Sequence, residues 1–340
     1  MRRILSVLLI SAFILTGCST APTETSAEVT GSTGVTEVTA PSATEATKPS
    51  KYEFNPHVHT DLLSEICTEE HWQALYNMCD AIRAGEEAFE CGNEEAFKWC
   101  TDDVTIGALF PAACMMVERG TYENGTGTIK YKISKEDMAV REQNFENEIV
   151  RILNAAVLPE CSDFEKAMCL YDYMCNYFTY DHSDIDGAGV DDFGNYACFM
   201  TKKGICTELA ACYAYLLLQC GVDALEYQEY SMAFHAWTYV LIDGKGYNVD
   251  VTWGLRPEDG GEMELKYFMM TDDERAAQGF DKDAYQIALL SYWKSDYDQS
   301  RFACNDTRFS ELHDGTFVSI DLERKVIEYM ADGLKEFSYE

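Results

Sequence analysis

A cysteine, a histidine and an aspartate follow one another along the chain in an order that could support nucleophilic catalysis. Cys206 begins the segment CTELAACYAYLLLQC, His235 lies in FHAWTYV, and Asp250 lies in NVDVTW. A cysteine thiolate attacks acyl carbon atoms, a histidine carries the proton, and a carboxylate orients the imidazole. Together these residues would carry out acyl transfer from an amide, a reaction that needs no metal or organic cofactor.

The segment around Cys206 predicts a buried helix. Its apolar residues occupy nearly every face, and Gly221 marks its expected end. Cys206 would lie in the first turn, where unpaired N–H groups and the helix dipole stabilise a thiolate. Cys212, in the middle of the same helix, would gain no such stabilisation. Most of the 14 cysteines are expected to be packing residues, so the position and the partners of Cys206 distinguish it.

His235 and Asp250 are expected on the two strands of one hairpin. Asp243-Gly244 is a favourable two-residue turn between them. With that turn, Trp237 faces Asp250 and Thr252 faces His235. His235 and Asp250 then share one face of the hairpin as diagonal neighbours, within reach of each other's side chains.

The motifs GIC, HAW and VDVTW, in this order, resemble the transglutaminase-like cysteine superfamily, whose members share a papain-like core. The resemblance extends over about residues 160–275, from the run SDFEKAMCLYDYMCNYFTYD to the run LKYFMMTDDE. It implies an α+β fold in which a nucleophile helix packs on an antiparallel sheet. It also implies that Cys206 is the nucleophile, His235 the base and Asp250 the orienting acid.

Four further residues are expected near this triad. Trp237 and Trp253 would shield the imidazole and its partner from water. The resemblance places Tyr196 near the oxyanion. Glu208 stands where many bacterial members have a glycine, and an acid there would disfavour the thiolate or shape the substrate cleft.

The outcome of the acyl transfer is open at this level. A thioester on Cys206 would be taken by water, as in a protease or amidase, or by another amine, as in cross-linking. The alternative is a non-catalytic lipoprotein that uses the same fold as a binding scaffold. A third interpretation is binding or remodelling of the cell wall, with its peptide stems as the substrate.

The N-terminus predicts export and anchoring. Residues 1–17 form a signal peptide that is too short to span a membrane, and its ending LTGC resembles the bacterial lipoprotein signal. That resemblance implies cleavage before Cys18, a lipid on its sulfur, and a place on the outer face of the bacterial cytoplasmic membrane. Residues 18–52, rich in Thr, Ser, Ala, Glu and Pro, predict a disordered stalk.

The net charge of −33 bears on the partners of the protein. So acidic a chain is repelled by nucleic acid and by anionic lipid, so that the membrane contact would come from the lipid on Cys18 alone. We therefore expect a peptide or protein substrate and no nucleic-acid partner.

The chain from residue 53 onward predicts two parts. Residues 53–157 form a mainly helical module with a hairpin at Asn124-Gly125 and a long amphipathic helix after Ser134. Residues 158–340 form the transglutaminase-like domain, whose first helix has Ser162 and Glu165 as a capping box.

Neither the loop HSDIDGAGVDDFGNY nor the cysteines predict a metal site. An EF-hand placed on the loop would need acidic ligands where His182 and Phe193 stand. No C-x-x-C pair is present. The cysteines mostly occupy apolar helical positions and are expected to be small core residues, as at Cys169, Cys175, Cys212 and Cys220.

Replacing Cys18 with serine should release the protein from the membrane or stall its processing, because serine offers no sulfur to the lipid. Fractionation of cells that produce the variant measures this. An unchanged membrane fraction would count against lipidation.

Overall fold

The computed structural model describes residues 51–182, 194–229, 234–257, 260–290 and 297–340. The predicted signal peptide, nearly all of the predicted stalk and residues 183–193 of the Gly/Asp loop lie outside these described residues. The described chain belongs to one compact unit, Pro49–Glu340.

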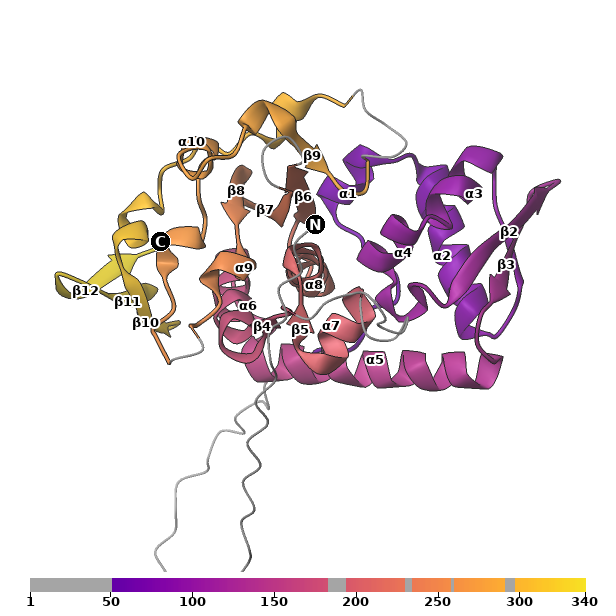
Figure 1. Cartoon of the computed structure of the whole chain (residues 1–340), viewed down its shortest axis with the longest axis horizontal. Helices are drawn as coiled ribbons and strands as arrows, with labels where there is room; N and C mark the ends of the chain where they lie inside the picture. Colours follow the sequence, from indigo (N-terminus) through magenta and orange to yellow (C-terminus); the bar gives the residue numbers. More distant parts are fainter. Residues whose placement is uncertain (1–50, 183–193, 230–233, 258–259, 291–296) are drawn as a thin grey trace, which may run out of the picture. The chain divides into compact units, whose positions relative to one another are not determined.

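The N-terminal part of this unit contains helices and one small antiparallel sheet (Figure 1). Strands β2 (Val117–Glu123) and β3 (Thr126–Tyr131) form the predicted hairpin, and β1 (Ala88–Glu90) pairs with the other side of β3. The turn residues Asn124 and Gly125 have φ values of 50° and 84°, a conformation that these two residue types adopt readily. The helices here are α1 (Asp61–Ile66), α2 (Glu69–Arg83), α3 (Glu94–Cys100), α4 (Asp103–Leu109) and η1 (Pro111–Ala113).

The next two helices begin at their predicted caps. The Ser134 hydroxyl accepts the N–H of Asp137 at 3.0 Å. The Ser162 hydroxyl accepts the N–H of Glu165 at 3.3 Å, and the Glu165 carboxylate accepts the N–H of Ser162 at 2.7 Å. These bonds satisfy N–H groups that have no partner within the helix. The helices are α5 (Lys135–Ala156) and α6 (Asp163–Tyr177).

A buried helix packs on a four-stranded antiparallel sheet, as predicted. Helix α8 (Cys206–Gln219) lies against β6 (Ala224–Glu229) and β7 (His235–Ile242), and the strand order is β8-β7-β6-β9. Residues 209–220 are all buried, because α4, α6 and α7 also pack on this helix. The other elements named here are α7 (Asn195–Thr201), β8 (Lys245–Val249) and β9 (Tyr285–Ile287).

The β7–β8 hairpin has the predicted two-residue turn. Asp243 and Gly244 both have positive φ, 52° and 72°, which matches the twist of the flanking strands. The pairing of Thr238 with Val249 follows from this turn and shows that the predicted register is correct.

The pairing predicted farther along the hairpin, between Thr252 and His235, is wrong. Strand β8 ends before Asp250, because this residue becomes the N-cap of a short helix, α9 (Val251–Gly254). Its Oδ1 atom accepts the N–H of Trp253 at 3.1 Å. The cap turns the chain out of the sheet and leaves the other carboxylate oxygen for other partners.

The remaining elements surround this sheet and helix. A short parallel pair immediately precedes α8, and a separate antiparallel sheet of order β10-β11-β12 ends the chain. The elements are β4 (Thr179–Tyr180), β5 (Lys203–Gly204), η2 (Leu265–Tyr267), α10 (Asp272–Ala276), η3 (Lys282–Ala284), η4 (Gln299–Phe302), η5 (Ser310–Asp314), β10 (Thr316–Asp321), β11 (Val326–Ala331) and β12 (Gly333–Ser338).

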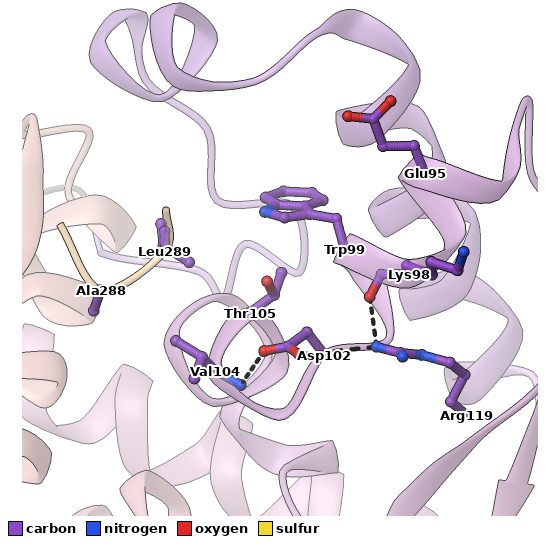
Figure 2. Close-up of a pocket in the computed structure, with 9 residues that line it drawn as sticks. All are labelled: Glu95, Lys98, Trp99, Asp102, Val104, Thr105, Arg119, Ala288 and Leu289. Carbon is purple, nitrogen blue, oxygen red and sulfur yellow. Dashed lines mark hydrogen bonds and ion pairs between the residues drawn. The ribbon is translucent and has the colours of Figure 1, made fainter. Parts of the chain in front are cut away.

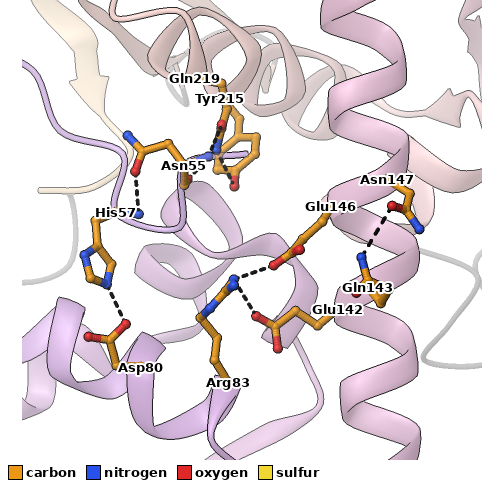
Figure 3. A network of polar contacts seen from close by, with 10 residues as sticks. All are labelled: Asn55, His57, Asp80, Arg83, Glu142, Gln143, Glu146, Asn147, Tyr215 and Gln219. Carbon is orange, nitrogen blue, oxygen red and sulfur yellow. Dashed lines mark hydrogen bonds and ion pairs between the residues drawn. The ribbon is translucent and has the colours of Figure 1, made fainter. Parts of the chain in front are cut away.

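One apolar core runs across the predicted boundary between residues 157 and 158. The ring of Phe145 on α5 lies 5.5 Å from that of Phe199 and 5.7 Å from that of Tyr215, which belongs to α8. At the end of α8, the Gln219 side chain accepts the N–H of Asn55 at 3.0 Å and donates to its carbonyl at 2.7 Å (Figure 3). The N-terminal part therefore helps to hold α8 in place.

The cysteines of the described chain are thiols without disulfide bonds, and all but Cys169 are buried. Three of the four predicted core cysteines are therefore buried and Cys169 is half-buried. Within the described ranges, no set of three or more His, Cys, Asp and Glu side chains is arranged to hold a metal ion. None of the helices described is long and apolar enough to cross a bilayer.

Replacing Gly254 with alanine should destabilise the fold, because the new Cβ would lie 1.9 Å from the Tyr171 hydroxyl oxygen. Tyr171 is fully buried, and its ring centre lies 5.0 Å from that of Phe268, so it has little room to move. We expect a loss of about 1–3 kcal/mol in the free energy of unfolding, measured by urea denaturation.

Gly92→Ala is the matched control for this substitution. Its added Cβ would meet no neighbour closer than 3.8 Å, so stability should change by less than about 0.5 kcal/mol. Equal losses in the two variants would contradict the steric role assigned to Gly254.

Candidate active site

Cys206 is the first residue of α8 and is almost completely buried. Its side chain packs with Ala210 and Ala236, and its thiol interacts with the His235 side chain and acts to raise the pKa of that imidazole. Because it occupies the first helical position, its backbone N–H has no acceptor within the helix. Cys206 therefore provides both the thiol and an unpaired backbone N–H, and both lie at the positive end of the helix dipole.

Glu208 closes the start of this helix. Its Oε2 atom accepts the N–H of Ile205 at 2.9 Å, and its Oε1 atom accepts the N–H of Gly194. A side chain at Gly204 would meet the Cys198 sulfur at 2.7 Å and Oε2 of Glu208 at 3.1 Å, so glycine permits this close approach. The carboxylate expected to act on the thiolate or on the cleft is thus bound to backbone amides as a helix cap.

His235 connects Cys206 to Asp250. The residue begins β7, and its Nε2 atom lies 2.8 Å from Oδ2 of Asp250. The Cys206 thiol is a further partner of this imidazole and acts to raise its pKa. The structure therefore brings the three predicted residues together through one imidazole, from the start of a helix, the start of a strand and the cap of a second helix.

Aromatic rings enclose this imidazole. Trp253 stacks on it with ring centres 5.1 Å apart, Phe280 lies at 5.5 Å and Trp237 at 6.3 Å. Trp237 is fully buried, and its Nε1 donates to Asn248 at 2.7 Å. Trp253 keeps 38% of its surface exposed, so it separates the histidine from solvent.

Asp250 is fully buried and has three partners. Oδ2 lies 2.8 Å from both His235 Nε2 and Arg275 Nη2, and Oδ1 accepts the N–H of Trp253. Burial alone would raise the pKa of this carboxyl, but Arg275 and then His235 outweigh burial and hold the pKa below its ordinary value. The carboxylate is therefore charged at neutral pH.

The same charges act on the histidine. Burial and Arg275 act to lower the pKa of the His235 imidazole, whereas the hydrogen bonds to Asp250 and Cys206 raise it, with a net increase to about 9. Below that pH, an imidazolium lies between the thiol group and a buried carboxylate. This is the protonation state needed to deliver a proton to a leaving amine.

Tyr196, which the resemblance places near the oxyanion, lies on α7 and contacts α5. The Arg141 guanidinium carbon is 3.3 Å from its ring centre, and the Phe145 ring is 6.0 Å away. A different tyrosine, Tyr180, pairs with Gly204 just before α8, and partial burial, then the charge of Cys206, raises the pKa of its phenol. Tyr180 reaches this place because β4 pairs with β5 immediately before α8.

Arg275, Phe280 and Tyr180 are parts of the site that sequence reasoning missed. Arg275 is the one basic residue in TDDERAAQGF, directly after the run LKYFMMTDDE. A basic residue in an acidic helical turn is ordinarily a solvent-exposed ion-pair partner, so local pattern gave no reason to place it in the core. Tyr180 ends a tyrosine-rich helical run and carries no distinguishing spacing.

A separate cavity of about 280 Å³ lies among α3, α4 and the residues after β9 (Figure 2). Arg119 at its edge donates to the Lys98 carbonyl at 2.7 Å and lies 3.8 Å from Asp102. Asp102 in turn caps α4 by accepting the N–H of Val104 at 3.1 Å. The Arg119 and Asp102 side chains are thus engaged within the protein, and no member of the Cys206 site lines this cavity.

The family comparison agrees with this geometry. Residues 151–251 match the family model described as the transglutaminase-like superfamily, and this range includes Cys206, His235 and Asp250. The chain thus carries a transglutaminase-like superfamily domain. No curated protein matches the chain.

Three solved structures show distant likeness. A candidate cysteine protease from Cytophaga hutchinsonii is 14% identical over 42% of this chain and 63% of its own, with a TM-score of 0.23. A TGase is 16% identical over 60% of each chain, with a TM-score of 0.30. Arylamine N-acetyltransferase C from Bacillus anthracis is 16% identical over 58% of this chain and 93% of its own, with a TM-score of 0.28. The chain thus spans less than two thirds of the first two proteins, and these likenesses do not bear on activity.

His235 should titrate near pH 9 in the folded protein, and Asp250→Asn should lower its pKa markedly, because burial and Arg275 would then act without the carboxylate. NMR titration of the imidazole resonances measures both values.

Asp80→Asn is the control, because it removes the carboxylate from a different histidine pair, His57 and Asp80, whose atoms lie 2.8 Å apart (Figure 3). The His235 titration should be the same as in the unaltered protein. If Asp250→Asn also left it unchanged, the carboxylate would not be the cause of the raised pKa.

Proposed function

We propose that this protein is a thiol-dependent acyl-transfer enzyme acting on peptide or glutamine amides. The observation that carries the proposal is the chain of contacts from the first residue of a buried helix through one imidazole to a buried, charged carboxylate: Cys206, His235 and Asp250. The transglutaminase-like superfamily match over these residues supports it.

In the proposed reaction, the proton of the Cys206 thiol passes to His235, and the resulting thiolate attacks the amide carbon so that a C–S bond forms. The C–N bond breaks as the His235 imidazolium gives its proton to the leaving amine. Water or a second amine then attacks the thioester while His235 takes the proton of that nucleophile. The C–S bond breaks, and His235 returns the proton to the sulfur, which restores the thiol. The reaction as proposed uses no metal or organic cofactor.

The oxyanion of the tetrahedral intermediate would be held by the backbone N–H of Cys206 and one further donor. The Tyr180 phenol is the candidate for that donor, since Tyr180 pairs with Gly204, two residues before Cys206. Trp237, Trp253 and Phe280 would keep water from the imidazole and so strengthen the charge interactions inside the site.

The proposed place of action is the outer face of the bacterial cytoplasmic membrane, reached through a lipid on Cys18. This part of the proposal rests on sequence, because residues 1–50 lie outside the described chain. A lipid anchor followed by a stalk of residues 18–52 would give the enzyme access to peptide or protein substrates near the membrane, including peptides of the cell wall.

Cys206→Ala should abolish turnover on a panel of peptide and glutamine substrates, a loss of at least about 10⁴-fold, while the fold is retained. His235→Ala should be nearly as damaging, and Asp250→Asn severe but milder. Product analysis by mass spectrometry distinguishes hydrolysis from cross-linking.

Cys212→Ala is the matched control on the same helix. Its sulfur is fully buried and donates to the Asn195 carbonyl at 3.6 Å, so the change should cost at most about 1 kcal/mol of stability and leave turnover intact. Absence of turnover in the unaltered protein on every substrate would favour the non-catalytic scaffold. Equal losses in both variants, following loss of fold, would defeat the assignment of Cys206.

A further inference from the structure

Arg275 is a fully buried cation directly behind the proposed triad. Its Nη2 atom lies 2.8 Å from Oδ2 of Asp250, the same oxygen that contacts Nε2 of His235 at 2.8 Å. A buried guanidinium is rare unless it is paired, because it loses its hydration. The ion pair with Asp250 is the charge interaction that compensates for this loss.

The guanidinium is held at this place from several sides. Its central carbon lies 4.2 Å from the ring centre of Phe280, 4.4 Å from that of Trp237 and 4.7 Å from that of Trp253. Its Nη1 atom donates to the Gln278 carboxamide at 2.6 Å. The three rings that enclose the His235 imidazole thus also enclose the cation, and they limit its movement.

We propose that Arg275 is a positioning residue of this active site: its ion pair keeps the Asp250 carboxylate ionised and fixed, so that His235 is oriented toward Cys206. This inference rests on the proposed function. Arg275 touches no reacting atom and acts through Asp250 alone. A guanidinium suits the task, because its Nη2 atom pairs with the carboxylate while its Nη1 atom donates to Gln278.

The charged and titratable groups around this pair come from several elements. His235 faces Asp250 from β7. The phenols and the thiol that interact electrostatically with Arg275 or Asp250 lie on α6, η2 and β9, and each has its own pKa raised by burial, so they stay neutral at physiological pH. They are Tyr171, Cys175, Tyr267 and Tyr285. Arg275 is therefore the cation that balances Asp250 when His235 is neutral.

Loss of Arg275 should change the pKa values of Asp250 and His235 in one direction. The guanidinium lowers the pKa of Asp250 and also that of His235. Without the guanidinium, Asp250 and His235 should each keep their protons to higher pH. The pH range in which a charged Asp250 lies beside a protonated His235 should therefore move upward as a whole. A purely structural loss would reduce the amount of active protein without moving that range.

The experiment follows iodoacetamide alkylation of Cys206 in the full chain as a function of pH, quantified by mass spectrometry of the peptide that contains it, together with the NMR titration of His235. In Arg275→Met and Arg275→Gln, the half-maximal alkylation pH and the His235 pKa should each rise by about one unit. Arg275→Lys keeps the charge, so both values should return most of the way to those of the unaltered protein.

Arg83→Met is the matched control. Arg83 is also paired with carboxylates, with its Nη1 atom 2.9 Å from Glu142, but on α2 and α5 (Figure 3). This variant should leave both profiles unmoved. If Arg275→Met does not fold, Arg275→Gln and Arg275→Lys carry the comparison, because both side chains are flexible and only the lysine is charged.

Unmoved profiles in a folded Arg275→Gln variant would overturn the inference, and so would an equal shift in Arg275→Lys and Arg275→Gln, since charge would then be irrelevant. Failure of the proposed function has a different signature. Turnover would be absent or unaffected by Cys206→Ala, whereas the His235 titration would still report the effect of Arg275 on Asp250.

Discussion

The structure of this site depends on one buried carboxylate. Asp250 is ionised in the core, which costs several kcal/mol unless each oxygen is bound. Three partners hold it: His235 and the N–H of Trp253 through hydrogen bonds, and the Arg275 guanidinium through an ion pair. Each partner comes from a different element, so the carboxylate links strand β7, helix α10 and helix α9 in one place. A change in any of these elements would leave a charge without its partner.

The need for this carboxylate explains the local departures from regular structure. The hairpin pairs only as far as Val249, because a longer strand would leave Asp250 in the sheet and Trp253 far from it. The short helix α9 instead brings the ring of Trp253 over the imidazole, where Phe280 and Trp237 also lie. Exclusion of water by these rings strengthens the interactions among the charges that they enclose.

Helix α8 meets this arrangement from the other side. It is held by the sheet, by α6 and α7, and by the N-terminal part, where Phe145 and Asn55 contact its far end. Glu208 fixes its first turn by binding backbone amides, so the position of Cys206 does not depend on the thiol's own contacts. The N-terminal part thus contributes to the site although none of its residues belongs to the triad.

Local chemistry made much of this predictable from the sequence. The caps at Ser134 and Ser162, the turn at Asp243–Gly244 with its register, and the buried helix after Cys206 follow from neighbouring residues, whose turn, capping and alternation rules act over a few positions. Tertiary structure alone decided the rest. Arg275, Phe280 and Tyr180 join the site, and Glu208 becomes a cap, because distant elements pack there. Such contacts depend on where whole helices and strands come to lie, which no short pattern of residues encodes.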